Sequence, residues 1–456
     1  MAEPLSPADL SAIQAERGPV HMHVGGICVF DGAVDRDTVV RRLRERIHLI
    51  PRYTMCLEEA PLGLAQPGWV EDESFDVDRH VRRAAVAAPG NDAELCELAG
   101  QILSQPLDRD RPLWQITTVE GLAGGRSALV AKMHHALVDG LAAVDVSTVI
   151  LDPTAEGLDI PPPEPRAAAE SHGSARLDSL TRIASAQLDL PRRLAREAVA
   201  RTVDPRSYAR QVRSAAGVVG ELARVRPQAP DTRLNAPIGR ERRVALARCR
   251  LDDVKAVRKA TGATVNDVLL ATVALMLTEY LGDDAPDHAV ALVPVSVRTE
   301  EERGEGGNRI STVFVDLPLG GEPLERLSQI HEATTAAKGS AQVQAGALIV
   351  GATGLAPPVV SSLAVRAMSG PRMFNLVVSN VPGPQQTFYL AGVPLLEVFP
   401  TVPLNPRNQA LSIGIVSYDG GVHFGLQADR DALPDLDLAA AGIERAAAGL
   451  VAAAAT

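Results

Sequence analysis

The residues of this chain best suited to chemistry lie in the segment Lys132-Met-His-His-Ala-Leu-Val-Asp-Gly140. Neighbouring side chains on a strand point to opposite faces, so His134 and His135 cannot serve the same purpose. An imidazole near its ordinary pKa is well suited to moving a proton near neutral pH. Asp139 can brace the following turn, and Gly140 permits a tight backbone there. The segment predicts general acid–base catalysis, although a structural histidine pair explains the local pattern equally well.

A second candidate lies where Thr264 is expected to cap a long helix. Asp267 follows three residues later, where a carboxylate favours a helix N-terminus. Between them, Asn266 could add a side-chain donor to the free backbone N–H groups, and together these could hold a developing oxyanion. Helix capping alone explains the same residues. Ser379 and Asn380, which end an apolar strand before a Pro-Gly-Pro turn, are weaker candidates.

The segment Pro106–Trp114, upstream of the histidines, also has an unusual composition. Two Pro-Leu pairs bracket four alternating charges, and the segment ends in one of the chain's two tryptophans. Arg109 and Arg111 could form ion pairs with the acidic residues beside them. The pattern is typical of a surface loop that crosses onto a strand, and on its own it indicates no chemistry.

Several well-known catalytic motifs are missing from the sequence. It has no GxSxG elbow of serine hydrolases, no GxxxxGK[ST] phosphate loop and no HExxH zinc motif. Its four cysteines have neither metal-ligand nor CxxC spacing. We therefore expect a mechanism that needs no metal and no redox cofactor.

Size and composition favour a globular protein of two domains. The chain has 456 residues, of which 46% are hydrophobic and 22% charged. Its net charge of −11 argues against a general nucleic-acid-binding protein. Residues 1–7 are acidic and short of apolar side chains, which is unlike a signal peptide, so a cytoplasmic location is expected.

Hydrophobic periodicity predicts a mixture of strands and helices in both halves of the chain, which indicates an α/β or α+β fold. The predicted strands are residues 23–30, 116–120, 128–134, 243–250, 289–297, 310–317, 374–379, 410–417 and 422–427, and the predicted helices are 36–47, 91–104, 141–150, 252–261, 264–280 and an alanine-rich helix at the C-terminus.

Two segments raise the question of a lipid surface. Residues 166–243 contain 16 arginines against 8 acidic residues, a net charge of +8, with helical stretches at 179–200 and 208–222. They fit either a solvated helical linker or a basic surface that meets anionic lipid head groups. Residues 339–365 carry no charge but contain several glycines and a Pro-Pro pair, which favours buried, broken helices over a membrane span.

Taken together, these residues resemble the bacterial wax ester synthase/acyl-CoA:diacylglycerol acyltransferase family. The segment HHALVDG matches HHxxxDG, which CoA-dependent acyltransferases share with condensation domains. Several motifs in one order are far more specific than any one of them, and they cover nearly the whole chain. Residues 401–409 depart from the family pattern, which bears on the choice of acceptor. The matching segments are 4–7 (PLSP), 22–25 (MHVG), 51–52 (PR), Trp69, 75–82 (FDVDRHVR), 106–114 (PLDRDRPLW), 134–140, 266–271 (NDVLLA), 294–298 (PVSVR), 307–311 (GNRIS), 379–384 (SNVPGP), 417–420 (SYDG) and 424–425 (FG).

The resemblance implies two chloramphenicol-acetyltransferase-like domains joined by a helical crossover, with an active-site tunnel at their interface. We expect an N-terminal acyltransferase-like domain at residues 1–160, an arginine-rich helical crossover at 161–242 and a C-terminal acyltransferase-like domain at 243–456. The implied function is O-acyl transfer in triacylglycerol biosynthesis or wax ester synthesis, within lipid and glycerol metabolism. The implied partners are acyl-CoA and a diacylglycerol or fatty alcohol, with peripheral attachment to the inner membrane face or to lipid droplets.

The resemblance also implies roles for individual residues. His135 is the general base for an acceptor hydroxyl that attacks the thioester of a long-chain acyl-CoA, and His134 supports the geometry. Asp139 orients the turn by pairing with an arginine, and Asn266 is the candidate oxyanion donor. The arginine is expected to be Arg52 or Arg298, and the residues expected to contact substrate are Gly140, Ser379 and Asn380.

Two other interpretations of the same motifs remain open. A stand-alone condensation-type acyltransferase would take polyketide or peptide acyl groups from a carrier protein, although PLDRDRPLW and SNVPGP favour the lipid enzyme. A catalytically inactive paralogue would bind lipid without releasing CoA. The sequence does not fix the acceptor, the chain length of the acyl group or the oligomeric state.

Overall fold

The computed structural model describes residues 3–6, 9–10, 12–13, 16, 18–58, 67–137, 149–161, 229–296, 310–338, 373–405 and 408–456. The chain divides into two compact units, Met1–Ile160 with Arg226–Thr456, and Pro161–Val225. Apart from Pro161, the described residues belong to the first unit. Three predicted features lie outside them: the helical stretches at 179–200 and 208–222, the uncharged segment 339–365, and residues 141–148 of a predicted helix.

A six-stranded sheet carries the two adjacent histidines. Its strand order is β12-β13-β2-β7-β6-β5, and all neighbours are antiparallel except β5 and β6. The helix α3 (Asp92–Ser104) contacts β7 and also β8, a strand of the second large sheet. The strands of this first sheet are β2 (His23–Phe30), β5 (Val81–Ala85), β6 (Trp114–Glu120), β7 (Ser127–His134), β12 (Tyr389–Leu390) and β13 (Val393–Thr401).

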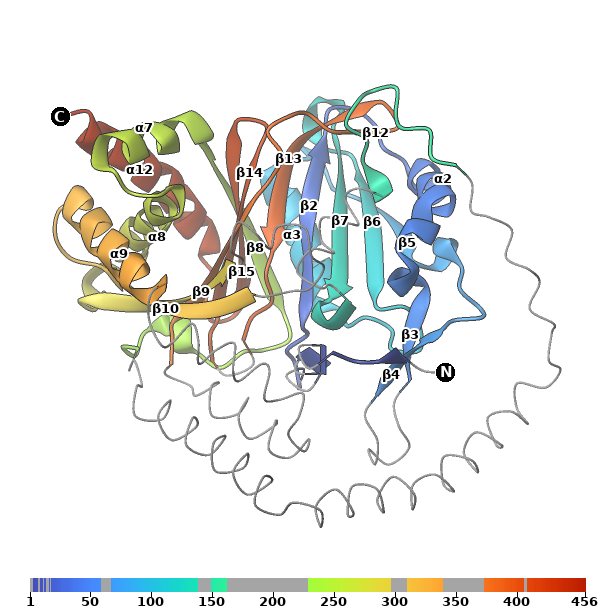
Figure 1. Ribbon diagram of the computed structural model, residues 1–456, viewed down its shortest axis with the longest axis horizontal. Helices are drawn as coiled ribbons and strands as arrows, with labels where there is room; N and C mark the ends of the chain where they lie inside the picture. The colour runs from blue at the N-terminus through green and yellow to red at the C-terminus, as the bar shows by residue number, and fades with distance from the viewer. Residues whose placement is uncertain are drawn as a thin grey trace, which may run out of the picture. The chain divides into compact units, whose positions relative to one another are not determined.

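A second six-stranded sheet has the order β10-β9-β11-β14-β15-β8 and mixes parallel with antiparallel pairs. Figure 1 shows its helices α7, α8, α9 and α12 gathered on one side of it. The strands are β8 (Arg242–Arg250), β9 (His288–Ser296), β10 (Ile310–Pro318), β11 (Leu376–Pro382), β14 (Leu411–Tyr418) and β15 (Gly421–Asp429), and the helices are α7 (Leu251–Thr261), α8 (Val265–Leu281), α9 (Pro323–Lys338) and α12 (Leu436–Ala454).

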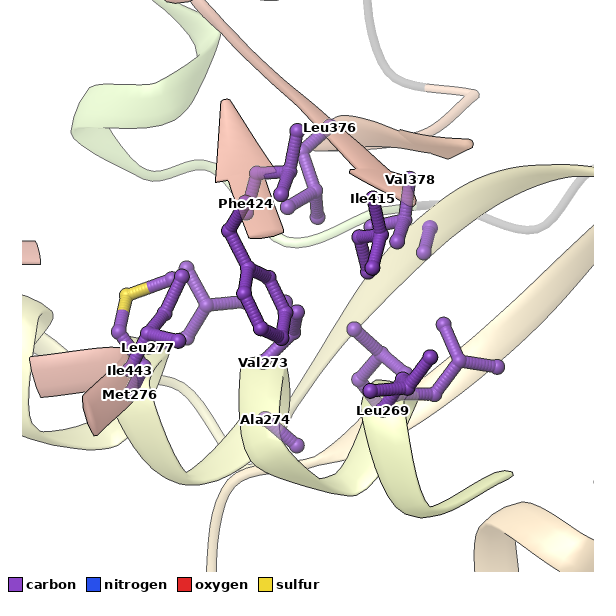
Figure 2. Close-up of a cluster of buried hydrophobic side chains, with 14 of the residues drawn as sticks. Leu269, Val273, Ala274, Met276, Leu277, Leu376, Val378, Ile415, Phe424 and Ile443 are labelled. Carbon is purple, nitrogen blue, oxygen red and sulfur yellow. The ribbon is translucent and has the colours of Figure 1, made fainter. Parts of the chain in front are cut away.

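Helix α8 forms the centre of the second core. It is apolar on nearly all sides, which is the pattern of a helix surrounded by protein. Figure 2 shows its side chains meeting those of Leu376, Ile415 and Phe424 from the sheet and Ile443 from α12. By length and composition alone, residues 265–284 could cross a membrane. Their burial in this core instead accounts for their apolar character.

Strand β13 brings the two large sheets into contact. It belongs to the C-terminal half of the chain but pairs with β2 in the first sheet, while also contacting β14 and β15 of the second. Glycine is required at this crossing, because a Cβ atom at Gly425 would lie 2.0 Å from the carbonyl oxygen of Pro400. A Cβ atom at Gly414 would also lie 2.8 Å from Pro400. These glycines allow the two sheets to approach closely.

The remaining described elements complete the first half. Helix α2 (Arg36–Arg46) is tied to the chain that follows the histidine motif, because the Arg46 guanidinium lies 2.7 Å from a carboxylate oxygen of Asp152. Both side chains are buried, and Arg42 reaches the same carboxylate at 3.0 Å. A small third sheet consists of β1 (Glu3–Pro4), β3 (Met55–Glu58) and β4 (Gly68–Glu71).

The predicted mixed α/β architecture is confirmed. The predicted strands, and the predicted helices that fall within the described residues, differ from the observed ones by no more than three residues at either end. The sequence analysis missed α9 and the strands β1, β3, β4, β5, β12 and β13. The domain boundaries at residues 160 and 242 stay predictions.

Candidate active site

The two adjacent histidines lie where a strand changes into a tight helical turn. Strand β7 ends at His134, and the 3₁₀ helix η6 (His135–Leu137) begins with the next residue. The backbone N–H of His135 donates to the carbonyl of Met22 at 2.7 Å, which fixes the start of the turn. The side chain of His134 is only 2% exposed, whereas that of His135 is exposed. The two side chains therefore have different surroundings, one buried and one exposed.

Both ring nitrogens of His134 face specific groups. The backbone N–H of Ala136 donates to Nδ1 at 3.0 Å, so Nδ1 carries no proton. The other nitrogen, Nε2, lies 3.4 Å from a carboxylate oxygen of Glu16. In the neutral ring the proton is consequently on Nε2, facing that carboxylate. This arrangement suits a structural ring, because Nδ1 is occupied by the Ala136 N–H and Nε2 is buried facing Glu16.

His135 has the opposite surroundings. Its ring reaches solvent, and no other described residue forms a hydrogen bond with its side chain. The protein around the ring hinders its hydration, which lowers the pKa of His135, and the neighbouring His134 lowers it further. A ring that is neutral and accessible at physiological pH can accept a proton from a bound hydroxyl.

Glu16 is the centre of a charged cluster behind His134. Besides His134, it contacts the guanidinium of Arg109 and, at 3.4 Å, Nδ1 of His21. Burial raises the pKa of Glu16, but hydrogen bonding to these three side chains outweighs burial and holds the pKa well below its ordinary value. A cavity of about 290 Å³ reaches the cluster and is lined by Glu16, Gly18, His21, Pro106, Leu107, Arg109, Leu113 and His134.

Glu16, His21 and His23 also have the residue types of a metal site. Their potential ligand atoms all lie within 4.8 Å of one another. However, Arg109 contacts the Glu16 carboxylate, and a guanidinium at that position opposes a second cation. Burial, followed by the charge of Lys132, lowers the pKa of His23 to about 2, so His23 stays neutral. We therefore assign Glu16 to the ion pair with Arg109.

Lys132 anchors the strand that carries the histidines. Its side chain is fully buried, and Nζ donates at 2.8 Å to the carbonyls of Ile102 and Gln105. These carbonyls belong to the last turn of α3 and its C-cap, where a cation is favourable. Burial lowers the pKa of Lys132 to about 8. The contact links α3 to β7 two residues before His134.

Asn266 and Asp267 lie at the N-terminus of α8, as predicted, and they have different partners. Thr264 and Asp267 form a capping box, in which each side chain accepts from the other's backbone N–H. The Asp267 carboxylate also contacts Nδ1 of His331 and the hydroxyl of Thr334, each at 2.7 Å. Burial raises the pKa of Asp267, but these hydrogen bonds lower it below its ordinary value overall.

The side chain of Asn266 is half-buried beside the end of β11. Its carbonyl oxygen accepts from the side-chain amide of Asn380 at 3.2 Å. Among the residues that the structure describes, none accepts a hydrogen bond from the Asn266 amide nitrogen, which can therefore act as a donor. Ser379 is half-buried on the same strand, opposite Gly414 in β14. The structure thus brings together Asn266 and Asn380, two residues singled out separately in the sequence.

For the other predicted site residues, the structure shows no contact between one predicted residue and another among the residues that it describes. Asp139, Gly140 and Arg298 lie outside the described residues. Arg52, one expected partner of Asp139, contacts the carboxylates of Glu3 and Asp9. Among the described residues, no hydrogen bond or ion pair joins His135 to Asn266.

Sequence reasoning missed Glu16. It is remote in the chain from both Arg109 and His134, and no motif marks it. Arg111 contacts the neighbouring Asp108 at 3.4 Å, in agreement with the predicted local pairing, whereas the contact of Arg109 with Glu16 was not foreseen. Arg109 lies inside the PLDRDRPLW motif, whereas Glu16 lies between the PLSP and MHVG segments and belongs to neither.

Family models match both halves of the chain. The wax ester synthase/diacylglycerol acyltransferase catalytic domain matches residues 5–269, and the C-terminal domain of the same family matches residues 306–450. A probable diacylglycerol O-acyltransferase of Mycobacterium tuberculosis (strain H37Rv) is 33% identical over 444 residues, covering 93% of each chain. A putative diacylglycerol O-acyltransferase of the same strain is 36% identical over 411 residues, covering 85% of this chain and 84% of the relative.

Solved structures agree with this assignment. The wax ester synthase/diacylglycerol acyltransferase from Marinobacter aquaeolei VT8 superposes with a TM-score of 0.70 at 27% identity, covering 99% of this chain and all of that one. The first condensation domain of the calcium-dependent antibiotic synthetase has a TM-score of 0.60 at 19% identity, covering 100% and 97%, which shows a shared fold.

The mixed α/β fold, the family models and the relatives make this protein an acyltransferase enzyme. The chain belongs to the wax ester synthase/diacylglycerol acyltransferase family.

Proposed function

We propose that the protein moves a long-chain acyl group from acyl-CoA to a lipid hydroxyl, making triacylglycerol or wax ester, with His135 as the general base. The observation that carries the residue assignment is the difference between the two histidines. Both nitrogens of His134 face protein groups, whereas His135 is accessible and has a lowered pKa. The names of the relatives support the choice of substrates.

The proposed reaction is direct transfer within a ternary complex. His135 takes the proton from the acceptor hydroxyl as its oxygen attacks the thioester carbonyl carbon. The resulting oxyanion accepts a hydrogen bond from the amide nitrogen of Asn266. The intermediate then expels the CoA sulfur, which receives the proton from His135. Because a thiolate is a good leaving group, a base, orientation and exclusion of water are the main requirements.

In this proposal acyl-CoA is a substrate, and the chain's own residues carry out the chemistry without a cofactor. The enzyme works in the cytoplasm, at the surface of the membrane or of a lipid droplet, because its acceptors are water-insoluble. Asp139 orients the turn after the histidines, and Gly140, Ser379 and Asn380 lie along the substrate path.

The defining measurement is release of the CoA thiol from palmitoyl-CoA, first with diacylglycerol and then with hexadecanol. Acceptor-dependent release is expected, and the ratio of the two rates ranks the acceptors. Release only from a carrier-bound acyl group would favour the condensation-type alternative. Binding of lipid without release from any donor would identify an inactive paralogue and refute the proposal.

The pH dependence follows from the lowered pKa of His135. A general base must be unprotonated, so the rate constant kcat/KM should rise with pH through the pKa of His135 and then level off. Because the hindered hydration of the ring lowers that pKa below 6.5, the acid limb should have its midpoint below pH 6.5 and the rate should be flat near pH 7. A midpoint above pH 7 in the rate profile would contradict this environment for the base.

Replacing Asn266 with alanine is expected to lower kcat by about 100-fold with little change in KM, because removal of one oxyanion donor costs about 10² to 10³ in kcat. Steady-state kinetics with palmitoyl-CoA would measure this. Asn380→Ala is the matched control: it removes the partner of Asn266 but leaves the proposed donor, so its loss should be smaller. Equal losses in the two variants would assign Asn266 a structural role.

A further inference from the structure

We propose that Glu16, held in place by Arg109, is a positioning residue that fixes the orientation of His134 and, through it, the turn that presents His135. This inference rests on the proposed function, since it concerns how the base is held. It gives the PLDRDRPLW segment a task, because that segment supplies Arg109.

The first link runs from His134 to the turn. Nδ1 of His134 accepts the backbone N–H of Ala136, which lies inside η6 immediately after His135. This hydrogen bond requires Nδ1 to be unprotonated and the ring to keep one orientation. If the ring turned over or moved its proton to Nδ1, the bond would be lost and a buried N–H would be left unpaired.

The second link runs from Glu16 to His134. The carboxylate lies 3.4 Å from Nε2, on the opposite side of the ring from Ala136. A carboxylate beside Nε2 favours the tautomer that carries its proton there, which is the tautomer the Ala136 bond requires. Because Glu16 remains ionised throughout the physiological range, this preference is constant.

The third link runs from Arg109 to Glu16. Its guanidinium contacts the carboxylate oxygen that also faces His134. The side chain of Glu16 is only 13% exposed, so an unpaired charge there would be costly, and Arg109 offsets that cost. The cavity behind His134 is bounded by both residues. Removal of the carboxylate would therefore leave Nε2 of His134 facing open space.

The experiment is chemical rescue of Glu16→Ala. We expect kcat for acyl transfer to fall about 10- to 100-fold with KM for palmitoyl-CoA nearly unchanged, since a misplaced base slows reaction more than binding. Added formate, which fits the cavity and can bind Arg109, should restore a large part of kcat. The double variant Glu16→Ala/Arg109→Gln should show no rescue, because the anion would have lost its cation.

Arg111→Gln is the matched control. It removes an arginine of the same segment whose contact is with Asp108, so activity should stay at the wild-type level. The ¹⁵N chemical shifts of the His134 ring provide a second measurement, assigned with a His134→Gln variant. They should show the proton on Nε2 in the wild type, a mixture of tautomers in Glu16→Ala, and recovery with formate.

Wild-type kcat and an unchanged tautomer in Glu16→Ala would overturn the inference. So would a loss of activity that formate does not restore while melting temperature falls, because that result describes a structural role only. If the wild type and Arg111→Gln both fail to transfer acyl groups, the proposed function fails instead. In that case the ¹⁵N shifts still decide whether Glu16 controls the ring of His134.

Discussion

His135→Ala is expected to abolish acyl transfer while leaving the fold intact. Removing the base should lower kcat by about 10³-fold or more, within the range for general-base catalysis combined with lost orientation. The fold should survive because the side chain is exposed and no other described residue forms a hydrogen bond with it. CoA thiol release with palmitoyl-CoA, run beside a thermal melt of wild type and variant, would measure both effects.

His134→Ala is the informative companion to that variant. Its side chain is 2% exposed and accepts a backbone N–H, so its loss should lower the melting temperature as well as kcat. Retention of a near-wild-type rate by His135→Ala would remove the base assignment. If His134→Ala were instead fully stable and inactive, the roles of the two histidines would have to be exchanged.

Helices and strands could be predicted from the sequence where their hydrophobic and capping patterns lie in adjacent residues. Helix α8 is an example, since its apolar run, Thr264 cap and Asp267 are all readable from adjacent residues. Strand β13 was missed because Pro394 and Pro400 argue against a central strand. Among the described strands, its neighbour on one side is the two-residue β12, and the glycines of β14 and β15 accommodate Pro400. That tolerance depends on tertiary contacts, which no local pattern records.

In the candidate site, too, residues in local motifs were found from the sequence, whereas their partners from distant segments were not. His134, His135 and Asn266 stand in motifs and were found from spacing, whereas Glu16 acquires its partners only through folding. Asp267 was expected to act at its helix end, and its contacts with His331 and Thr334 became visible only when α9 was placed beside α8. Residue types and spacing can indicate which groups do chemistry, but the groups that hold them come from distant segments.

The second large effect is expected for Asp267→Ala, which should destabilise the folded protein by about 3 kcal/mol. The buried hydroxyl of Thr334 and the backbone N–H of Thr264, which loses its half of the capping box, would each be left without an acceptor, at a cost of about 1 to 2 kcal/mol each. The side chain of Asp267 is 0% exposed, so water cannot replace these bonds. The midpoint of urea unfolding, compared with wild type, would measure the change.

The pH dependence of the free energy of unfolding provides an independent check on the surroundings of the Asp267 carboxylate. Folding lowers the pKa of Asp267 below 3.8, so its stabilising contribution is fully present above pH 3.8 and is lost as the pH falls through the lower, folded pKa. The stability difference between wild type and Asp267→Ala should therefore be constant near neutral pH and shrink only in strong acid. A difference that vanished between pH 5 and 7 would contradict this environment.

His331→Ala removes the contact of α9 with Asp267 but leaves the capping box of α8. It therefore measures how much of the folding free energy comes from that contact alone. The His331 side chain is 40% exposed, so loss of its contact with Asp267 should cost only about 0.5 kcal/mol.

Asp267→Ala should also lower kcat at temperatures where it remains folded, because the first turn of α8 would no longer hold Asn266 beside Asn380. If Asp267→Ala lost stability but kept full kcat, the position of Asn266 would not matter to the reaction, and its assignment as oxyanion donor would have to be withdrawn.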